Sequence, residues 1–199
     1  MQFPHKDLCS RALEVIENNI LPLTRDGVTK GNKIFGAAIL RKTDLSLVVA
    51  NTNAETQNPL FHGEISTLNS FFKLPSTHRP PPSNCIFIST HEPCSLCLSA
   101  ITWTNFDNFY YFFGYDNTRD DFNIPHDLKI LEEVFNIKNG DYCRKNQFWE
   151  SKNINSMIDE VTSSNRDELI QQAGRIKTCY VELSKIYQNS KENSDIPLS

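Results

Sequence analysis

The sequence predicts an α/β protein in which short strands alternate with helices around one sheet. The chain has 199 residues, enough for one domain with a substantial core. Near the N-terminus, apolar residues recur at helical spacing, at Leu8, Ala12, Ile16 and Ile20. Further on, short β-branched runs alternate with helical stretches, a pattern that predicts parallel strands in the second half of the sheet.

The first half of the chain is expected to contain a helix, a hairpin and a second helix. The opening helix is expected to end near Pro22. Residues 33–40 and 45–51 are β-rich runs joined by a short polar turn, the pattern of a hairpin. A helix is expected over residues 62–73, followed by a proline-rich surface loop over residues 74–84.

The second half continues the alternation. Residues 85–90 and 108–114 are apolar and rich in β-formers, so we expect two buried strands. Helices are expected over residues 94–103 and 124–135. The apolar periodicity weakens from about Asn139.

The C-terminal third is expected to form an extension on a core of residues 1–138. Residues 139–189 are expected to be a helical extension packed on that core, and residues 190–199 a disordered tail. Phe148 and Trp149 have two interpretations: they cover a site as a lid, or they pack the C-terminal segment against the core. A stripe at steps of four and three indicates an amphipathic helix that packs on the domain or on a partner; it consists of Leu169, Ala173, Ile176, Tyr180, Leu183 and Tyr187.

Composition and charge exclude several classes of protein. No apolar run approaches the roughly 20 residues that cross a bilayer, so a membrane role is not expected. The net charge is −4 and no dense Lys/Arg cluster occurs, which favours a small-molecule substrate over a nucleic acid. The N-terminus lacks a secretory signal, which predicts a protein of the cytosol or nucleus. There the six cysteines are expected to be thiols or metal ligands, not disulfides.

Two cysteines have the spacing of metal ligands. Cys94 and Cys97 are three residues apart, so on a helix both thiols face the same side and can bind one tetrahedral ion. Such a pair also fits a redox couple, half of a structural zinc site, or two core cysteines. No second C-x-x-C completes a four-ligand site, whereas His62 lies upstream at the start of another expected helix. Three protein ligands and one open position are typical of catalytic zinc.

Glu64 follows His62 by two residues and is expected to have a different role. The helical rotation of about 200° directs Glu64 away from a shared ligand position. In the first helical turn its side chain would still reach a water on the metal and act as a proton shuttle. Zinc lowers the pKa of such a water to near neutrality, and helix N-termini favour thiolate and hydroxide.

These residues match a known signature. The stretches HGE at 62–64 and PCSLC at 93–97 match H-x-E…P-C-x-x-C of the zinc nucleobase deaminases. From about Phe35 to Gly114 the chain resembles the cytidine-deaminase-like superfamily, in its branch of cytosine, guanine and tRNA adenosine deaminases. HGEISTL is most similar to fungal cytosine deaminase, and EPCSLCLSAITW to guanine deaminase. Phe61 is bulkier than the family residue, and the chain beyond Asp116 matches no substrate-defining ending.

The resemblance implies a fold and an activity. The fold would be a three-layer α/β/α sandwich with a central mixed five-stranded sheet, plus the C-terminal helical extension. The activity would be hydrolytic deamination of a free nucleobase or nucleoside of the cytosine or guanine type. Zinc hydroxide, from one zinc ion per chain, would attack the amino-bearing ring carbon and release ammonia. A homodimer is implied; the alternative is a tRNA adenosine deaminase subunit, either editing or a non-catalytic scaffold.

The resemblance also implies roles for individual residues. Zinc would be bound by His62, Cys94 and Cys97, with Glu64 as the proton shuttle. The backbone at Gly63 and Cys94 would orient the water and the tetrahedral intermediate.

Three further residues are candidate substrate contacts, each with an ordinary alternative. Asn51, eleven residues before His62, would bind the base, although asparagine also commonly caps turns. Trp103 would stack on the substrate or belong to the core. Asp116, just past an expected strand end, would bind an exocyclic amine or be a solvated loop carboxylate. His91 is expected to be a hydrogen-bonded loop histidine and not a fourth ligand.

Overall fold

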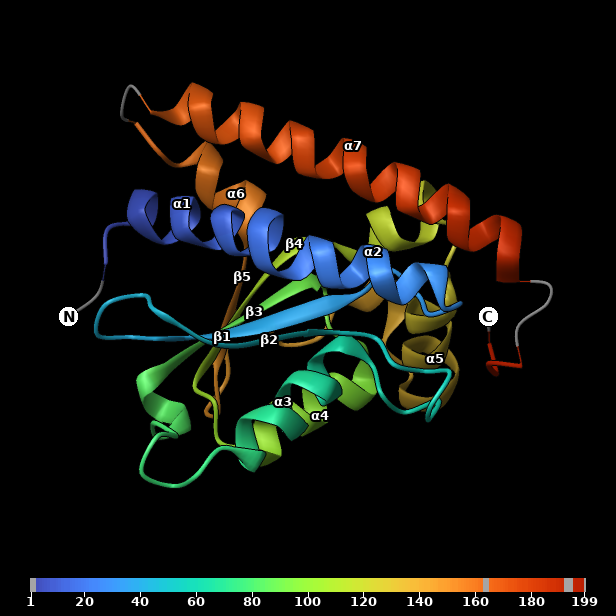
Figure 1. Cartoon of the computed structure of the whole chain (residues 1–199), viewed down its shortest axis with the longest axis horizontal. Coiled ribbons are helices and arrows are strands. Elements are labelled where there is room, and N and C mark those ends of the chain that lie inside the picture. Colours follow the sequence, from blue (N-terminus) through green and yellow to red (C-terminus); the bar gives the residue numbers. More distant parts are fainter. Residues whose placement is uncertain (1–2, 163–164, 192–194, 199) are drawn as a thin grey trace.

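The computed structural model describes residues 3–162, 165–191 and 195–198. Its strands are β1 (Gly36–Arg41), β2 (Leu47–Thr52), β3 (Cys85–His91), β4 (Asn108–Phe113) and β5 (Glu150–Asn153). They form one sheet in the order β2-β1-β3-β4-β5 (Figure 1). β1 runs antiparallel to β2 and β3, whereas β3, β4 and β5 are parallel. The predicted hairpin and the predicted parallel half of the sheet are both confirmed.

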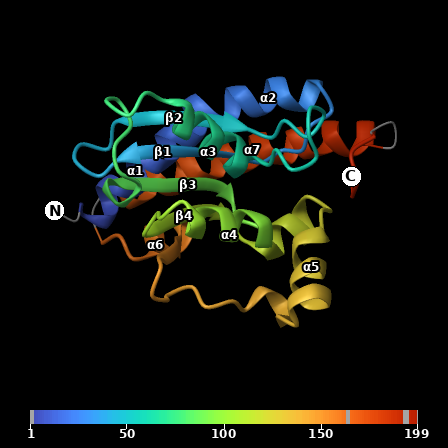
Figure 2. The same ribbon diagram turned by 90° about the horizontal axis from the view of Figure 1, so that it is seen from below.

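Helices cover both faces of this sheet. The helical segments are α1 (His5–Val15), η1 (Ile16–Ile20), α2 (Leu21–Thr29), α3 (Gly63–Lys73), η2 (Pro82–Asn84), α4 (Ser95–Trp103), η3 (Asn117–Asp121), α5 (His126–Phe135), η4 (Lys138–Gly140), α6 (Ile154–Asp159) and α7 (Arg166–Ser190). α1, α2, α6 and α7 lie on one face, and α3 and α4 on the other (Figures 1 and 2). The three-layer α/β/α prediction is confirmed. No helix in the described part of the chain is long and apolar enough to span a membrane.

The alternation of side chains along the central strands creates two cores. On β1, Ala38 and Leu40 belong to the core beneath α1 and α7, whereas Ala37 and Ile39 belong to the core beneath α3 and α4. Successive side chains of a strand point to opposite faces, so a strand covered on both faces is apolar throughout. This explains why residues 37–40 read as one continuous apolar run.

The prediction that the first helix ends near Pro22 is wrong. The helix continues through η1 into α2 and ends at Thr29. A proline lacks an N–H and its ring collides with the carbonyl one turn earlier in a regular helix. Here the π-helical turn η1 ends at Ile20, two residues before Pro22, and this wider turn accommodates the proline.

The sheet takes its fifth strand from the C-terminal third, where only helical structure was expected. β5 pairs parallel with β4, and Asn153 then caps α6 by accepting hydrogen bonds from the amides of Asn155 and Ser156. The strand is four residues long and polar, ESKN, so it has no apolar periodicity. The expected boundary at residue 138 therefore separates β5 from the sheet that it completes.

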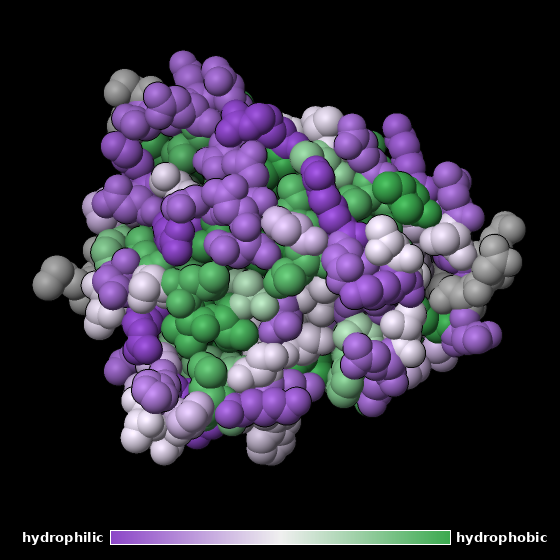
Figure 3. All heavy atoms as spheres, in the orientation of Figure 1, coloured by the Kyte–Doolittle hydropathy of each residue, from purple (hydrophilic) through white to green (hydrophobic). Residues whose placement is uncertain are grey.

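The long helix α7 packs by its predicted stripe. All six stripe residues from Leu169 to Tyr187 are buried, and α7 contacts α1, α2 and α6. In the view of Figure 3 the side formed by α1, α2 and α7 is mostly polar, although Ile170, Val181 and Ile186 of α7 are exposed. Apolar side chains gather in this view beside the half-buried edge strand β2. Of the expected tail, Ser190 still belongs to α7 and Ile196 is buried, while residues 192–194 and 199 lie outside the described part.

Candidate metal centre and active site

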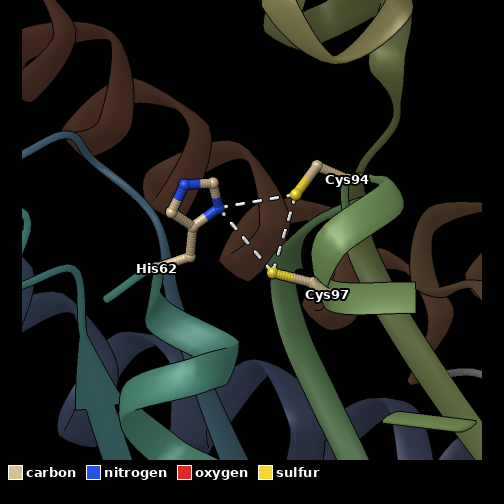
Figure 4. Close-up of side chains that lie close together, drawn as sticks. All are labelled: His62, Cys94 and Cys97. Carbon is tan, nitrogen blue, oxygen red and sulfur yellow. Dashed lines mark hydrogen bonds between the residues drawn. The ribbon is translucent and has the colours of Figure 1, made fainter. Parts of the chain in front are cut away.

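Two loops end at the same point of the molecule, and each leads into a helix. His62 is the N-cap of α3 and Cys94 is the N-cap of α4, both with extended backbone, and Cys97 lies in the first turn of α4. The side chains of all three point toward one another (Figure 4). Both helices direct their partly positive N-termini at this point, which favours thiolate over thiol.

The spacing of these three side chains fits a tetrahedral zinc ion. His62 Nδ1 lies 3.4 Å from Cys94 Sγ and 3.7 Å from Cys97 Sγ, and the two sulfurs are 3.7 Å apart. Tetrahedral zinc with usual bond lengths requires about 3.5 Å between nitrogen and sulfur and about 3.8 Å between sulfurs. Within the described residues, these three form the only group of metal-ligating side chains that lie this close together. They supply three of the four coordination positions of a tetrahedral ion and leave the fourth open.

Glu64 lies beside the metal ligands. Its side chain is buried; Oε1 accepts a hydrogen bond of 2.9 Å from Ser89 Oγ, and Oε2 lies 3.3 Å from Cys97 Sγ. Burial and the negative charge of Cys94 raise the pKa of this carboxyl. A carboxyl with a raised pKa next to an open metal corner suits proton transfer near neutral pH.

The ligands also shift one another's pKa values. The hydrogen bond with Cys97 and the charge of His62 hold the pKa of Cys94 well below its usual range, although burial opposes this. Burial would lower the pKa of His62, but Cys94, Glu64 and Glu55 outweigh it and raise the value to about 9. The site therefore attracts positive charge, as a cation site must.

Gly63 is required because α3 starts against β1. A Cβ at Gly63 would lie 2.6 Å from Gly36 Cα, so no side chain fits between these two backbones. The Gly63 N–H, expected to orient the intermediate, donates a hydrogen bond to Asn53 Oδ1. Asn53 thereby ties the start of α3 to the preceding loop.

Asn53, and not Asn51, occupies the buried position next to the metal ligands. Asn51 lies half-buried on β2 opposite Ala37, and both Asn51 and Asn53 line a surface hollow beside α3. Asn53 is 1% exposed and bonds both Gly63 and Glu55. Residues two apart on a strand share a face, so the sequence ANTN offers two equivalent candidates. Spacing from His62 alone does not distinguish them.

Trp103 and Asp116 are not brought to the metal ligands. Trp103 is 89% exposed at the far end of α4, about 13 Å along the helix axis from Cys94. Asp116 faces solvent and forms an ion pair of 3.0 Å with Arg119. The physical reason is that α4 starts at the site and runs away from it, and that the turn after β4 directs Asp116 outward.

Asp127 is a carboxylate near the site that the sequence analysis missed. It lies in the first turn of α5 and is half-buried. Helix α5 contacts α4, the helix that carries Cys97, and burial and the charge of Cys94 raise the pKa of Asp127 well above its usual range. An acidic residue in a first helical turn is common for reasons of capping and dipole, so the sequence offered no specific signal.

A second missed carboxylate, Glu92, supports the turn before Cys94. Its Oε1 accepts hydrogen bonds of 2.9 Å each from Tyr142 Oη and Arg144 Nη2, and its Oε2 accepts one from the Tyr115 N–H. Residues of the C-terminal third thus hold a segment that carries two metal ligands.

Phe148 and Trp149 behave differently from each other. Trp149 is buried against Phe109 and donates a hydrogen bond of 2.8 Å to Thr102 Oγ1, so it packs in the core. Phe148 is exposed.

His91 is not a ligand. It ends β3, is buried among aromatic rings beneath α7, and its Nδ1 lies 2.9 Å from Thr90 Oγ1. It is a hydrogen-bonded histidine, as expected, but it lies in the core instead of a loop.

The fold and the ligand set define a zinc-binding deaminase architecture. Residues 13–113 match the model of the cytidine and deoxycytidylate deaminase zinc-binding region. This match spans half of the chain, and the chain belongs to that family. The predicted resemblance and the zinc cofactor are confirmed.

Solved structures support the same fold. Guanine deaminase from Bacillus subtilis has a TM-score of 0.50 at 19% identity, over 85% of this chain and 92% of its own. A mutant of the protein NE0047 in complex with 8-azaguanine has a TM-score of 0.53 at 16% identity, over 89% of this chain and 84% of its own. A tRNA deaminase structure from work on A-to-I editing has a TM-score of 0.45 at 18% identity, over 66% of this chain and 92% of its own, and this lower similarity carries no argument about the fold. Such identities show the fold alone. No curated protein matches the chain in sequence.

Proposed function

We propose that this chain hydrolytically deaminates a small aminated heterocycle, a free nucleobase or nucleoside of the cytosine or guanine type. The observation that supports this most is the site itself. Three ligands stand at tetrahedral spacing with one corner open, and the buried carboxyl of Glu64 lies next to them. A structural zinc site would be closed by a fourth protein ligand and would need no such carboxyl.

The residues divide the chemistry among them. His62, Cys94 and Cys97 hold zinc, which when bound lowers the pKa of a water and so supplies the nucleophile at neutral pH. Glu64 accepts the proton of that water and delivers protons to the ring nitrogen and then to the departing amine. Ser89 keeps Glu64 Oε1 in place through its hydroxyl. The net change replaces the C–NH2 of the heterocycle by a carbonyl and releases ammonia.

Asp127 is the proposed contact to the base, in place of Asp116 and Trp103. A carboxylate accepts hydrogen bonds from ring N–H groups and exocyclic amines. Asp127 is half-buried in the first turn of α5, a helix that contacts α4, and the charge of Cys94 contributes to its raised pKa, whereas Asp116 is in an ion pair at the surface. Contact between Asn51 and the base stays a prediction.

The alternative is a subunit of a tRNA adenosine deaminase. A non-catalytic scaffold has no need of Glu64, which is present and placed at the site. The net charge of −4 disfavours a phosphate backbone as a partner. Filter binding at low and moderate salt tests this choice, and tight RNA binding with a steep salt dependence would contradict the small-molecule proposal. The homodimer also stays a prediction, for light scattering to test.

Ammonia release tests the proposal directly. The purified chain should contain about one zinc ion by elemental analysis and release ammonia from a member of a panel of cytosine, guanine, cytidine, adenine and guanosine. Glu64→Gln should keep the zinc and lose turnover, because the amide cannot carry the proton. Full activity in this variant would show that the proton shuttle is misassigned.

A further inference from the structure

The imidazole of His62 has two sides with different surroundings. Nδ1 faces the two sulfurs, and the second ring nitrogen points away from them (Figure 4). An imidazole that offers the Nδ1 lone pair to a metal keeps its proton on Nε2. On that side lies Glu55, with Oε1 3.9 Å from His62 Nε2. This distance is an electrostatic contact and exceeds hydrogen-bond length.

Glu55 is itself held firmly. Its side chain is 1% exposed, and Lys33 Nζ donates a hydrogen bond of 2.8 Å to Oε1. Oε2 accepts hydrogen bonds from the Lys33 backbone N–H at 3.2 Å and from Asn53 Nδ2 at 2.7 Å. With three donors on two oxygens, this carboxylate has little freedom to move.

A buried ion pair is weak as a stabilising device. Removing two charges from water costs about as much as their attraction returns, and apolar residues of equal volume often serve stability better. Lys33 and Glu55 are nevertheless both buried beside a metal ligand. Asn53 continues the connection to the Gly63 N–H, at the start of the helix that carries Glu64. The location of the Lys33–Glu55 pair therefore indicates a role at the metal centre.

We infer that Glu55 is a positioning residue for the metal centre, and that Lys33 and Asn53 hold its carboxylate where it orients the ring of His62. Carboxylates that face the free nitrogen of a metal-bound histidine fix its ring orientation and raise its basicity. The inference rests on the zinc site of the proposed function and is independent of the substrate.

Two variants separate positioning from plain stability. Glu55→Gln removes the carboxylate but leaves the Lys33 charge buried without its partner. Lys33→Met/Glu55→Gln removes both charges, so thermal stability should recover relative to the single variant. Zinc retention should stay about 10- to 100-fold below that of the parent chain in both variants. Zinc transfer to a chromogenic chelator measures retention, and the absorption spectrum of the cobalt-substituted protein reports ligand geometry.

The matched control is Asp107→Asn. Asp107 also pairs with a lysine, Lys42, through two contacts of 2.6 and 2.7 Å, but it precedes β4 at the end of the sheet away from the metal ligands. This variant should keep the parent zinc retention and cobalt spectrum.

The double variant decides the outcome. If it retains zinc like the parent and shows the parent cobalt spectrum, the inference is overturned. It is also overturned if zinc loss merely follows the loss of stability while the spectrum stays unchanged. A parent chain that takes up no zinc would overturn the proposed function and this inference together.

Discussion

The two loops that bring the metal ligands together are held in different ways. The loop before α3 is held by Lys33 and Glu55, which are 22 residues apart and both inside the matched family region. The turn before α4 is held by Arg144, which reaches Glu92 across 52 residues from a segment beyond the family match. The part of the chain that matches the family model thus supports one side of the site, and the C-terminal third supports the other.

Burial separates the two ion pairs further. The side chains of Lys33 and Glu55 are 8% and 1% exposed, whereas those of Arg144 and Glu92 are 38% and 3% exposed. A fully buried pair is insulated from salt, whereas a cation that reaches the surface is partly screened. We therefore expect the first pair to act mainly on the metal, and the second to act mainly on the folding of the C-terminal segment.

The largest predicted effect is that of Glu92→Ala. It leaves Arg144, Tyr142 and the Tyr115 N–H without their shared acceptor. We expect a loss of about 3 kcal/mol in the free energy of unfolding, because removing one partner strands buried donors. Urea denaturation measures it, with Glu150→Ala as a surface control. If folded Glu92→Ala retains less zinc than its loss of stability explains, the expected difference between the two loops is wrong.

Gly63→Ala tests the close approach between α3 and β1. Helix propensity alone predicts that alanine is stabilising. The clash with the Gly36 backbone predicts the opposite sign, a loss of about 1–3 kcal/mol. Gly174→Ala in α7 is the control; apart from its chain neighbours and the backbone of its own helix, no atom lies within 4 Å of its added Cβ, and it should stabilise by about 0.5–1 kcal/mol. Equal signs for the two variants in thermal unfolding would refute the close-packing account.

The smallest effect concerns His91, directly before Glu92. Burial lowers its pKa well below 6.5, so the folded chain keeps it neutral while the unfolded chain protonates it near pH 6.5. The unfolded state then binds more protons below that pH, so stability falls as pH falls. Below pH 6.5, the free energy of unfolding should fall with pH more steeply in the parent chain than in His91→Phe. The difference between the two slopes should approach about 1.4 kcal/mol per pH unit. Parallel stability curves from pH 7 to pH 5 would show that His91 does not titrate in this way.

Features that depend on a local pattern of residues could be predicted from the amino-acid sequence. Alternating strands and helices predict the α/β sandwich, and the six apolar positions of α7 identify its buried side. His62, Cys94 and Cys97 could be assigned because metal ligation requires these residue types, and because a spacing of three on a helix places two thiols together.

Features that depend on contacts between distant segments could not be predicted from local patterns and are seen only in the folded chain. Asn53 rather than Asn51 is buried next to His62, because the end of β2 meets the start of α3 there. β5 is a strand only because β4 offers it an unpaired edge. The roles of Glu55 and Glu92 depend on their ion pairs with Lys33 and Arg144. No local sequence pattern specifies which cation pairs with a buried carboxylate.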